Sequence, residues 1–277
     1  MMKSLNTAFE AYINKSPLLI MTPHSGRNYD KNFLKYISLD IDELRNTEDF
    51  FIDQLFSPLL KNFSFLNATF PRIFVDANRS PLEIDSNMWD NNNLESLFDN
   101  KSKKVLNGIG VFAKYNLFGK YLYTKKLPFS EAKWRLLNFY FPYHKKIKEI
   151  IQKTKRNHKK LLALDCHSMS SELVNEKIDI VISNCDNESS SVDLLRQVKK
   201  CFKKFKYNTQ LNHPFKGGFI TKNYGNPEKN IHFIQVEVNK KLYMDEQNLV
   251  LKKNSFSRLK VCFDNLIKDT LLYLDSN

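Results

Sequence analysis

The sequence predicts an α/β fold built around a largely parallel sheet. Two observations favour it: short apolar runs of strand length, and amphipathic helical stretches that alternate with them. The sequence has no internal repeat and no flexible linker. At roughly 150 residues per domain, 277 residues could form one large domain or two small ones. Without a linker, a single domain over residues 1–277 is the simpler prediction.

The predicted strands are apolar runs bounded by turn residues. Each is too short for a buried helix, and several are rich in β-branched residues. The runs cover residues 17–21, 73–75, 161–164, 178–182 and 233–238.

Helices are predicted between these runs. Thr47 is expected to cap one, because two acidic residues follow it and apolar residues then recur at helical spacing as far as Leu59. Ser130 is expected to cap a helix that runs to Pro142, where the next helix begins and continues to about Thr154. Two more amphipathic helices are predicted over residues 190–205 and 256–274.

The net charge of +13 indicates an anionic partner. Only eight of the 43 basic residues are arginine, the residue best suited to phosphate and base recognition, so the composition disfavours nucleic acid and favours a small anionic substrate. No apolar stretch approaches the 18 residues of a membrane span, and the N-terminus has no secretory pattern, so a cytoplasmic location is predicted. The four cysteines are scattered and are expected to be free thiols.

Chemically active side chains follow the predicted strands. His24 and His167 each come just after an apolar run, and the run at 73–75 leads into Asp76, Asn78 and Arg79. In open α/β sheets the binding crevice lies outside the carboxyl ends of the strands. We therefore expect these residues to converge there.

Two histidines and one carboxylate are the three protein ligands of a catalytic zinc ion, whose fourth position holds water. A lone histidine is more often structural, but two at matched strand ends favour a shared metal ion. Asp49 is the preferred acidic ligand, with Glu48 and Asp53 as alternatives, and Asp165 suits a role in orienting His167.

Glu237 lies within an otherwise apolar strand, where a carboxylate is costly unless it is paired or used. It could act as a general base beside the metal-bound water, or it could form a salt bridge with Arg79. A nucleophilic mechanism through Cys166 or Ser168 is disfavoured, because each is adjacent to His167 on a strand and points to the opposite face.

Six ordered motifs resemble the N-formylglutamate amidohydrolase family over roughly residues 17 to 270. They are Thr22-Pro-His-Ser-Gly26, Thr47-Glu-Asp49 through Asp53, Phe70-Pro-Arg-Ile-Phe-Val-Asp-Ala-Asn-Arg79, Asp165-Cys-His-Ser-Met169, Gly217-Gly-Phe-Ile-Thr221 and Gln235-Val-Glu-Val-Asn239.

The resemblance implies a zinc-dependent hydrolase that splits N-formyl-L-glutamate into formate and L-glutamate, a step of histidine degradation. It also implies a three-layer α/β/α sandwich around a mixed, largely parallel sheet, related to zinc carboxypeptidases and aspartoacylases.

The family's functional residues carry over by position. His24 and His167 would bind the metal ion, Asn78 and Arg79 would hold a substrate carboxylate, and Glu237 would activate water. The acidic ligand falls to Asp49, because Arg27 occupies the position where the wider group has it.

N-formylglutamate carries two carboxylates, so a second cation is expected, with Arg72, Lys222 and Arg27 as candidates. Lys222 and Val111 depart from residues common in the family, which leaves another N-acyl amino acid or a small peptide-like amide as an alternative substrate. A further alternative is a non-catalytic relative that binds an anion or RNA.

Overall fold

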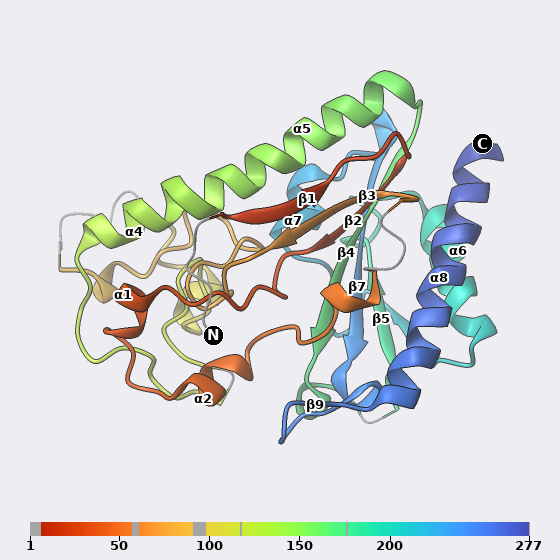
Figure 1. Cartoon of the computed structure of the whole chain (residues 1–277). Coiled ribbons are helices and arrows are strands. Elements are labelled where there is room, and N and C mark those ends of the chain that lie inside the picture. Colours follow the sequence, from red (N-terminus) through yellow and green to blue (C-terminus); the bar gives the residue numbers. More distant parts are fainter. Residues whose placement is uncertain (1–6, 57–60, 91–97, 117, 176, 277) are drawn as a thin grey trace. The chain divides into compact units, whose positions relative to one another are not determined.

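A seven-stranded sheet, with strands in the order β1-β3-β2-β4-β7-β5-β6, is the framework of the fold (Figure 1). The computed structural model describes residues 7–56, 61–90, 98–116, 118–175 and 177–276. The strands of this sheet are β1 (Phe9–Tyr12), β2 (Leu18–Thr22), β3 (Ser64–Ala68), β4 (Leu161–Met169), β5 (Ile180–Ser183), β6 (Thr209–Leu211) and β7 (Ile231–Asn239). A separate pair is formed by β8 (Met244–Asp245) and β9 (Val250–Leu251).

The sheet is mixed and largely parallel, as predicted. Strand β2 runs parallel to β3 and to β4, and β4 runs parallel to β7, whereas β5 is antiparallel to β7. The carboxyl ends of β2, β3, β4 and β7 therefore lie at one edge of the sheet. In the register of β4 and β7, His167 lies directly opposite Glu237.

Four of the five predicted strands are confirmed, but the one at residues 73–75 is wrong. Residues 72–74 form a turn, and the strand that pairs with β2 is β3, nine residues earlier. The apolar run is fully buried for a different reason, since it packs as a loop inside its own part of the chain. β3 escaped prediction because Ser64 and Asn67 interrupt its apolar pattern; Asn67 is paired with Thr22, whose hydroxyl donates to it at 2.9 Å.

The helices agree with the predictions best toward the C-terminus. The α-helices are α1 (Lys31–Leu34), α2 (Ile41–Arg45), α3 (Lys103–Leu106), α4 (Phe129–Arg135), α5 (Phe141–Asn157), α6 (Val192–Lys204), α7 (Phe219–Tyr224) and α8 (Lys253–Ser276). Short 3-10 turns cover 53–55, 86–88, 171–173, 227–229 and 240–242. α6 and α8 confirm the helices predicted over 190–205 and 256–274. Ser191 caps α6, its hydroxyl accepting the N–H of Leu194.

The helix predicted from Thr47 is wrong. The Thr47 hydroxyl donates to the carbonyl of Leu44, so it closes the end of α2 and caps nothing after it. Phe51 has a φ of 63°, a left-handed conformation that an α-helix cannot contain, and only the 3-10 turn Asp53–Leu55 follows. Leu59, the end of the predicted pattern, lies outside the described residues.

The two helices predicted around Pro142 form one continuous helical run from α4 to α5. A π-helical turn, Leu136–Tyr140, joins them, and Pro142 lies at the start of α5, directly after this irregular turn. Ser130 lies inside α4 and is not its cap; Pro128 occupies that position without a side-chain hydrogen bond.

The chain divides into two compact units. Unit 1 contains residues 1–10, 23–48 and 68–146, and unit 2 contains residues 11–22, 49–67 and 147–277. In unit 2, α6 and α8 pack against each other and cover one face of the sheet, and the greater part of α5 lies on the other side (Figure 1). The prediction of one domain over residues 1–277 stays a prediction.

Among the described residues, none of the helices combines the length and the apolarity that crossing a bilayer would require.

Arg135 organises the core of unit 1. It is completely buried, its guanidinium lies 4.9 Å from the Phe33 ring and 4.7 Å from the Phe74 ring, and it forms an ion pair with Glu131 at 3.0 Å. It also donates to the main-chain carbonyl of Phe74 at 3.2 Å. A buried arginine with these partners fixes the loop that leads to the predicted substrate residues.

We expect Arg135→Met to lower the free energy of unfolding by about 3 kcal/mol, because Glu131 and the Phe74 carbonyl lose their donor inside the core. Urea denaturation measures the change. Arg156→Met, at an exposed position near the end of α5, is the matched control. Equal stability of the two variants would show that Arg135 is dispensable for packing.

Candidate metal centre and substrate site

Glu237 and His167 lie side by side on neighbouring strands of unit 2. They are opposite each other in the parallel pairing of β7 with β4, so their side chains leave the same face of the sheet. Cys166, one position earlier, is part of the hydrophobic core on the other face, which confirms that it points away from His167. The amide of Gln235, on the same face as Glu237, donates to Glu237 at 2.8 Å.

His167 is held between two carboxylates. Its Nδ1 lies 3.0 Å from Oδ2 of Asp49, and its Nε2 lies 3.1 Å from Oδ1 of Asp165. Burial would lower the pKa of His167, but the negative charge of Asp165, the hydrogen bonds to both aspartates and the charge of Glu237 raise it well above its usual value. The site therefore attracts positive charge strongly.

Asp49 is the one of the three candidate acids that contacts His167. It is buried, and it also accepts the hydroxyl of Ser168 at 2.9 Å. Glu48, fully buried in unit 1, accepts the Tyr29 hydroxyl at 2.6 Å instead. Asp53 lies in the 3-10 turn that follows.

His24 is bound by an aspartate within unit 1. It lies two residues beyond the end of β2, and its Nε2 is 2.7 Å from Oδ1 of Asp76. Both are buried. Gly26 is required nearby, because a Cβ there would lie 2.2 Å from the carbonyl oxygen of Phe70.

Asp76 contacts His24, although no role of its own is predicted for it from the sequence. It accepts the N–H of Asn78 at 2.8 Å and the guanidinium of Arg72 at 2.9 Å in addition to His24. Burial would raise its pKa, but the interactions with His24, Arg72 and Arg79 hold it well below the usual value. Its position two residues before the Asn-Arg pair is the signal that could have indicated it.

Arg79 is oriented by two main-chain carbonyls. Its Nε donates to the carbonyl of Ile109 at 2.9 Å and its Nη1 to the carbonyl of Asn78 at 2.9 Å. Tyr140, in the π-helical turn, donates to the carbonyl of Arg79 at 2.7 Å, and His144 donates to the carbonyl of Ala77 at 2.9 Å. The helical run thus holds the loop that carries Ala77 and Arg79. Spacing alone gave no indication of this role for Tyr140 or His144.

The two residues that depart from the family pattern lie in different settings. Val111 is completely buried, and its main chain bonds Asp76 and Glu83. Lys222 lies in α7 with its side chain 72% exposed, 3.8 Å from Glu188.

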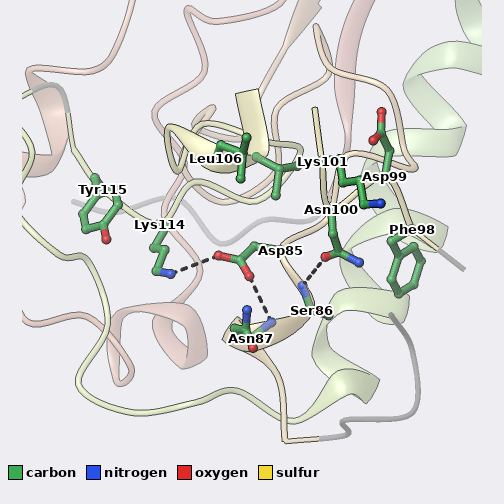
Figure 2. Close-up of a pocket in the computed structure, with 11 residues that line it drawn as sticks. Asp85, Ser86, Asn87, Phe98, Asp99, Asn100, Lys101, Leu106, Lys114 and Tyr115 are labelled. Carbon is green, nitrogen blue, oxygen red and sulfur yellow. Dashed lines mark hydrogen bonds and ion pairs between the residues drawn. The ribbon is translucent and has the colours of Figure 1, made fainter. Parts of the chain in front are cut away.

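A pocket of about 560 Å³ opens elsewhere in unit 1 (Figure 2). Asp85, in its wall, forms an ion pair with Lys114 at 3.0 Å and accepts the N–H of Asn87. None of the residues predicted for the site lines this pocket.

His24, Asp49 and His167 form a group of described side chains that could hold a metal ion. All three are buried, and they offer imidazole nitrogen and carboxylate oxygen, the donor set of a catalytic zinc site. Each histidine also contacts an aspartate outside this group: His24 contacts Asp76, and His167 contacts Asp165. A carboxylate of this kind fixes the tautomer of a metal-binding imidazole.

A mixed sheet with a buried histidine and carboxylates toward the carboxyl ends of its parallel strands is typical of enzymes of the α/β class. The comparison with known families identifies this one: residues 16–244 match N-formylglutamate amidohydrolase, and the chain belongs to this family. It is therefore an enzyme that hydrolyses an amide bond.

Individual relatives agree with this assignment. The chain is 29% identical to the N-formylglutamate deformylase of Pseudomonas aeruginosa over 240 residues, which cover 83% of each chain. It is 26% identical to the N-formylglutamate deformylase of Pseudomonas putida, over 83% of this chain and 82% of the relative. The crystal structure of an N-formylglutamate amidohydrolase from Ralstonia eutropha has the same fold, with a TM-score of 0.88 at 23% identity over 98% of this chain and 99% of the other.

Proposed function

We propose that this protein hydrolyses the formyl amide of N-formyl-L-glutamate and releases formate and L-glutamate. The observation that carries the proposal is the strand register that sets Glu237 opposite His167, which also contacts Asp49 at 3.0 Å. The hydrolysis of an unactivated amide requires a base next to a group suited to a cation, so this pairing supports the proposal. The names of the Pseudomonas relatives support the choice of substrate.

We propose that His24, Asp49 and His167 hold one divalent metal ion, and that this ion is zinc. Asp76 and Asp165, at the Nε2 atoms of the two histidines, would orient the imidazole rings toward the ion. Two nitrogens and one carboxylate oxygen suit zinc better than magnesium or calcium, which prefer oxygen alone. When bound, the ion would polarise the scissile carbonyl and lower the pKa of water.

Glu237 would move the protons of the reaction. Its carboxylate would accept a proton from the attacking water and then deliver it to the nitrogen of the leaving glutamate. The Gln235 amide, 2.8 Å from Oε1, would hold the carboxylate in place while its other oxygen faces the water.

Asn78 and Arg79 would bind a substrate carboxylate. The Arg79 guanidinium is already fixed by the carbonyls of Asn78 and Ile109, so little side-chain freedom is lost when the substrate binds. A clamp of this kind sets the distance between the scissile carbonyl and the attacking water.

The direct test is formate release from N-formyl-L-glutamate by the purified protein, before and after treatment with a chelator. We expect activity in the metal-loaded protein, loss of activity on chelation and recovery on addition of zinc. Full activity in chelated protein with no measurable metal content would exclude the metal-dependent route, and the absence of formate release from zinc-loaded protein would exclude the substrate.

Arg79→Ala is expected to lower kcat/KM for N-formyl-L-glutamate by at least about a hundredfold, because a charge-assisted clamp of about 3 kcal/mol is removed. Steady-state kinetics measures the loss. Circular dichroism of the same variant tests the alternative structural role: a salt bridge needed for folding would cost helix content and stability, whereas a substrate clamp would leave both unchanged.

A further inference from the structure

A substrate with two carboxylates needs two cationic contacts, and Arg79 supplies one of them. Of the candidates that the sequence offered for the second, Arg72 is already bound to Asp76 at 2.9 Å. Lys222 is largely exposed. Within unit 1 a different lysine lies beside Arg79.

That residue is Lys104, in the short helix α3. The carbonyl of Lys104 accepts the N–H of Ile109 at 2.8 Å, and the carbonyl of Ile109 accepts Nε of Arg79 at 2.9 Å. One residue therefore connects the main chain of α3 to the Arg79 side chain. Val111 makes a similar main-chain link between Glu83 and Asp76. Its N–H donates to the carbonyl of Glu83, and its carbonyl accepts the N–H of Asp76.

Lys104 is partly buried, and charges of both signs surround it. Arg79, Glu83, Asp76 and Arg72 all act on its ammonium group. Both carboxylates in this set have other partners. Asp76 binds His24 and Arg72, and Glu83 accepts the N–H of Ser80 at 3.0 Å.

The ammonium group of Lys104 itself forms neither a hydrogen bond nor an ion pair with any residue that the structure describes. Burial, followed by the positive charge of Arg79, lowers the pKa of Lys104 to about 8. A cation that is partly desolvated, feels the positive charge of an arginine and has no carboxylate paired with it is stabilised when an anion binds there.

We propose that Lys104 binds the second carboxylate of the substrate next to Arg79 and so gives the enzyme its preference for an acidic acyl-amino acid. This inference rests on the proposed function for the identity of the substrate. The structural part, a carboxylate site formed by Arg79 and Lys104, can be tested without turnover.

The first experiment compares N-formyl-L-glutamate with N-formyl-L-glutamine, which has the same shape but a neutral side chain, on the zinc-loaded enzyme. Lys104→Met is expected to lower kcat/KM for the glutamate substrate at least about tenfold, mainly through KM, and to change kcat/KM for the glutamine substrate less than about twofold. Lys104→Arg should restore part of the preference. Lys103→Met, at the exposed neighbouring position, is the matched control and should behave as the parent.

Two outcomes would overturn the proposal. In one, Lys104→Met reduces activity toward both substrates equally while the protein stays folded. In the other, Arg27→Met abolishes the preference for glutamate and Lys104→Met leaves it intact, which would assign the second carboxylate to Arg27.

The second experiment measures binding alone, by calorimetry with glutarate and with its monoamide, glutaramate. Lys104→Met should weaken glutarate binding about tenfold and leave glutaramate binding nearly unchanged. Because only the protonated ammonium attracts the carboxylate, the affinity of the parent for glutarate should fall between pH 7 and pH 9, and the affinity of Lys104→Met should fall less. A parent protein that releases no formate from N-formyl-L-glutamate would refute the proposed function, yet glutarate binding would still decide the role of Lys104. Unchanged glutarate binding in Lys104→Met would refute the site even if the enzyme is active.

Discussion

Glu237→Gln is expected to reduce kcat for formate release by about a thousandfold while metal content stays at the level of the parent. Glutamine has nearly the same shape, so the pairing of β7 with β4 and the packing around His167 should be preserved. What is lost is the basic oxygen that takes the proton from water. Single-turnover kinetics, together with metal analysis of the same preparation, measures both quantities.

The neighbouring amide offers a matched control for that variant. Gln235→Glu adds a carboxylate on the same strand face, two residues away, and should not replace Glu237 in the double variant Gln235→Glu/Glu237→Gln. Parent-level turnover by Glu237→Gln, with metal bound, would remove Glu237 from the proton-transfer role and return it to a structural one.

His167→Ala should lose bound metal and more than about 99% of activity. Loss of an outer partner of a metal ligand typically costs ten- to a hundredfold in affinity, and His167 is proposed as a direct ligand. Asp49→Asn should show the same loss in weaker form, because an amide oxygen is a poorer ligand that carries no charge. Metal content after dialysis against a chelator-treated buffer is the measurement, and it does not depend on any substrate.

A purely structural His167 would give a different pattern. In that case His167→Ala would lower stability but bind zinc as the parent does, and added zinc would raise the Tm of the parent and of the variant equally. His158→Ala, at a partly buried position close to the end of α5, is the control histidine substitution.

The sheet and its histidines could be predicted because their signals are local. His24 and His167 follow continuous apolar runs, and the alternation around Glu237 is visible over six residues. These features depend on neighbours along the chain. The order of the strands in the sheet depends on contacts between distant parts of the chain. Asp49 and His167, which are in contact, lie 118 positions apart, so no short sequence pattern could show that they meet.

The errors share a physical cause. Residues 73–75 and the stretch after Thr47 are apolar because loops are buried in this protein, and burial alone does not distinguish a loop from a strand or a helix. Phe51 adopts a left-handed conformation that its residue type rarely takes, so the sequence carried no warning that a helix could not form there. Lys104 could not be singled out from the sequence, because the charges that act on it come together only in the folded chain.

The pairing of β4 with β7 also limits how this enzyme can change length. Removing one residue between Ile231 and Gln235 would shift the register of β7 by one residue. Glu237 would then point to the hydrophobic face of the sheet, where Ile234 and Val236 lie. Such a deletion would therefore cost activity and stability together. An insertion in the turn before Ile231, at residues 226–230, would leave the register of β7 unchanged. We therefore expect natural and engineered insertions to occur in this turn and not within the strand.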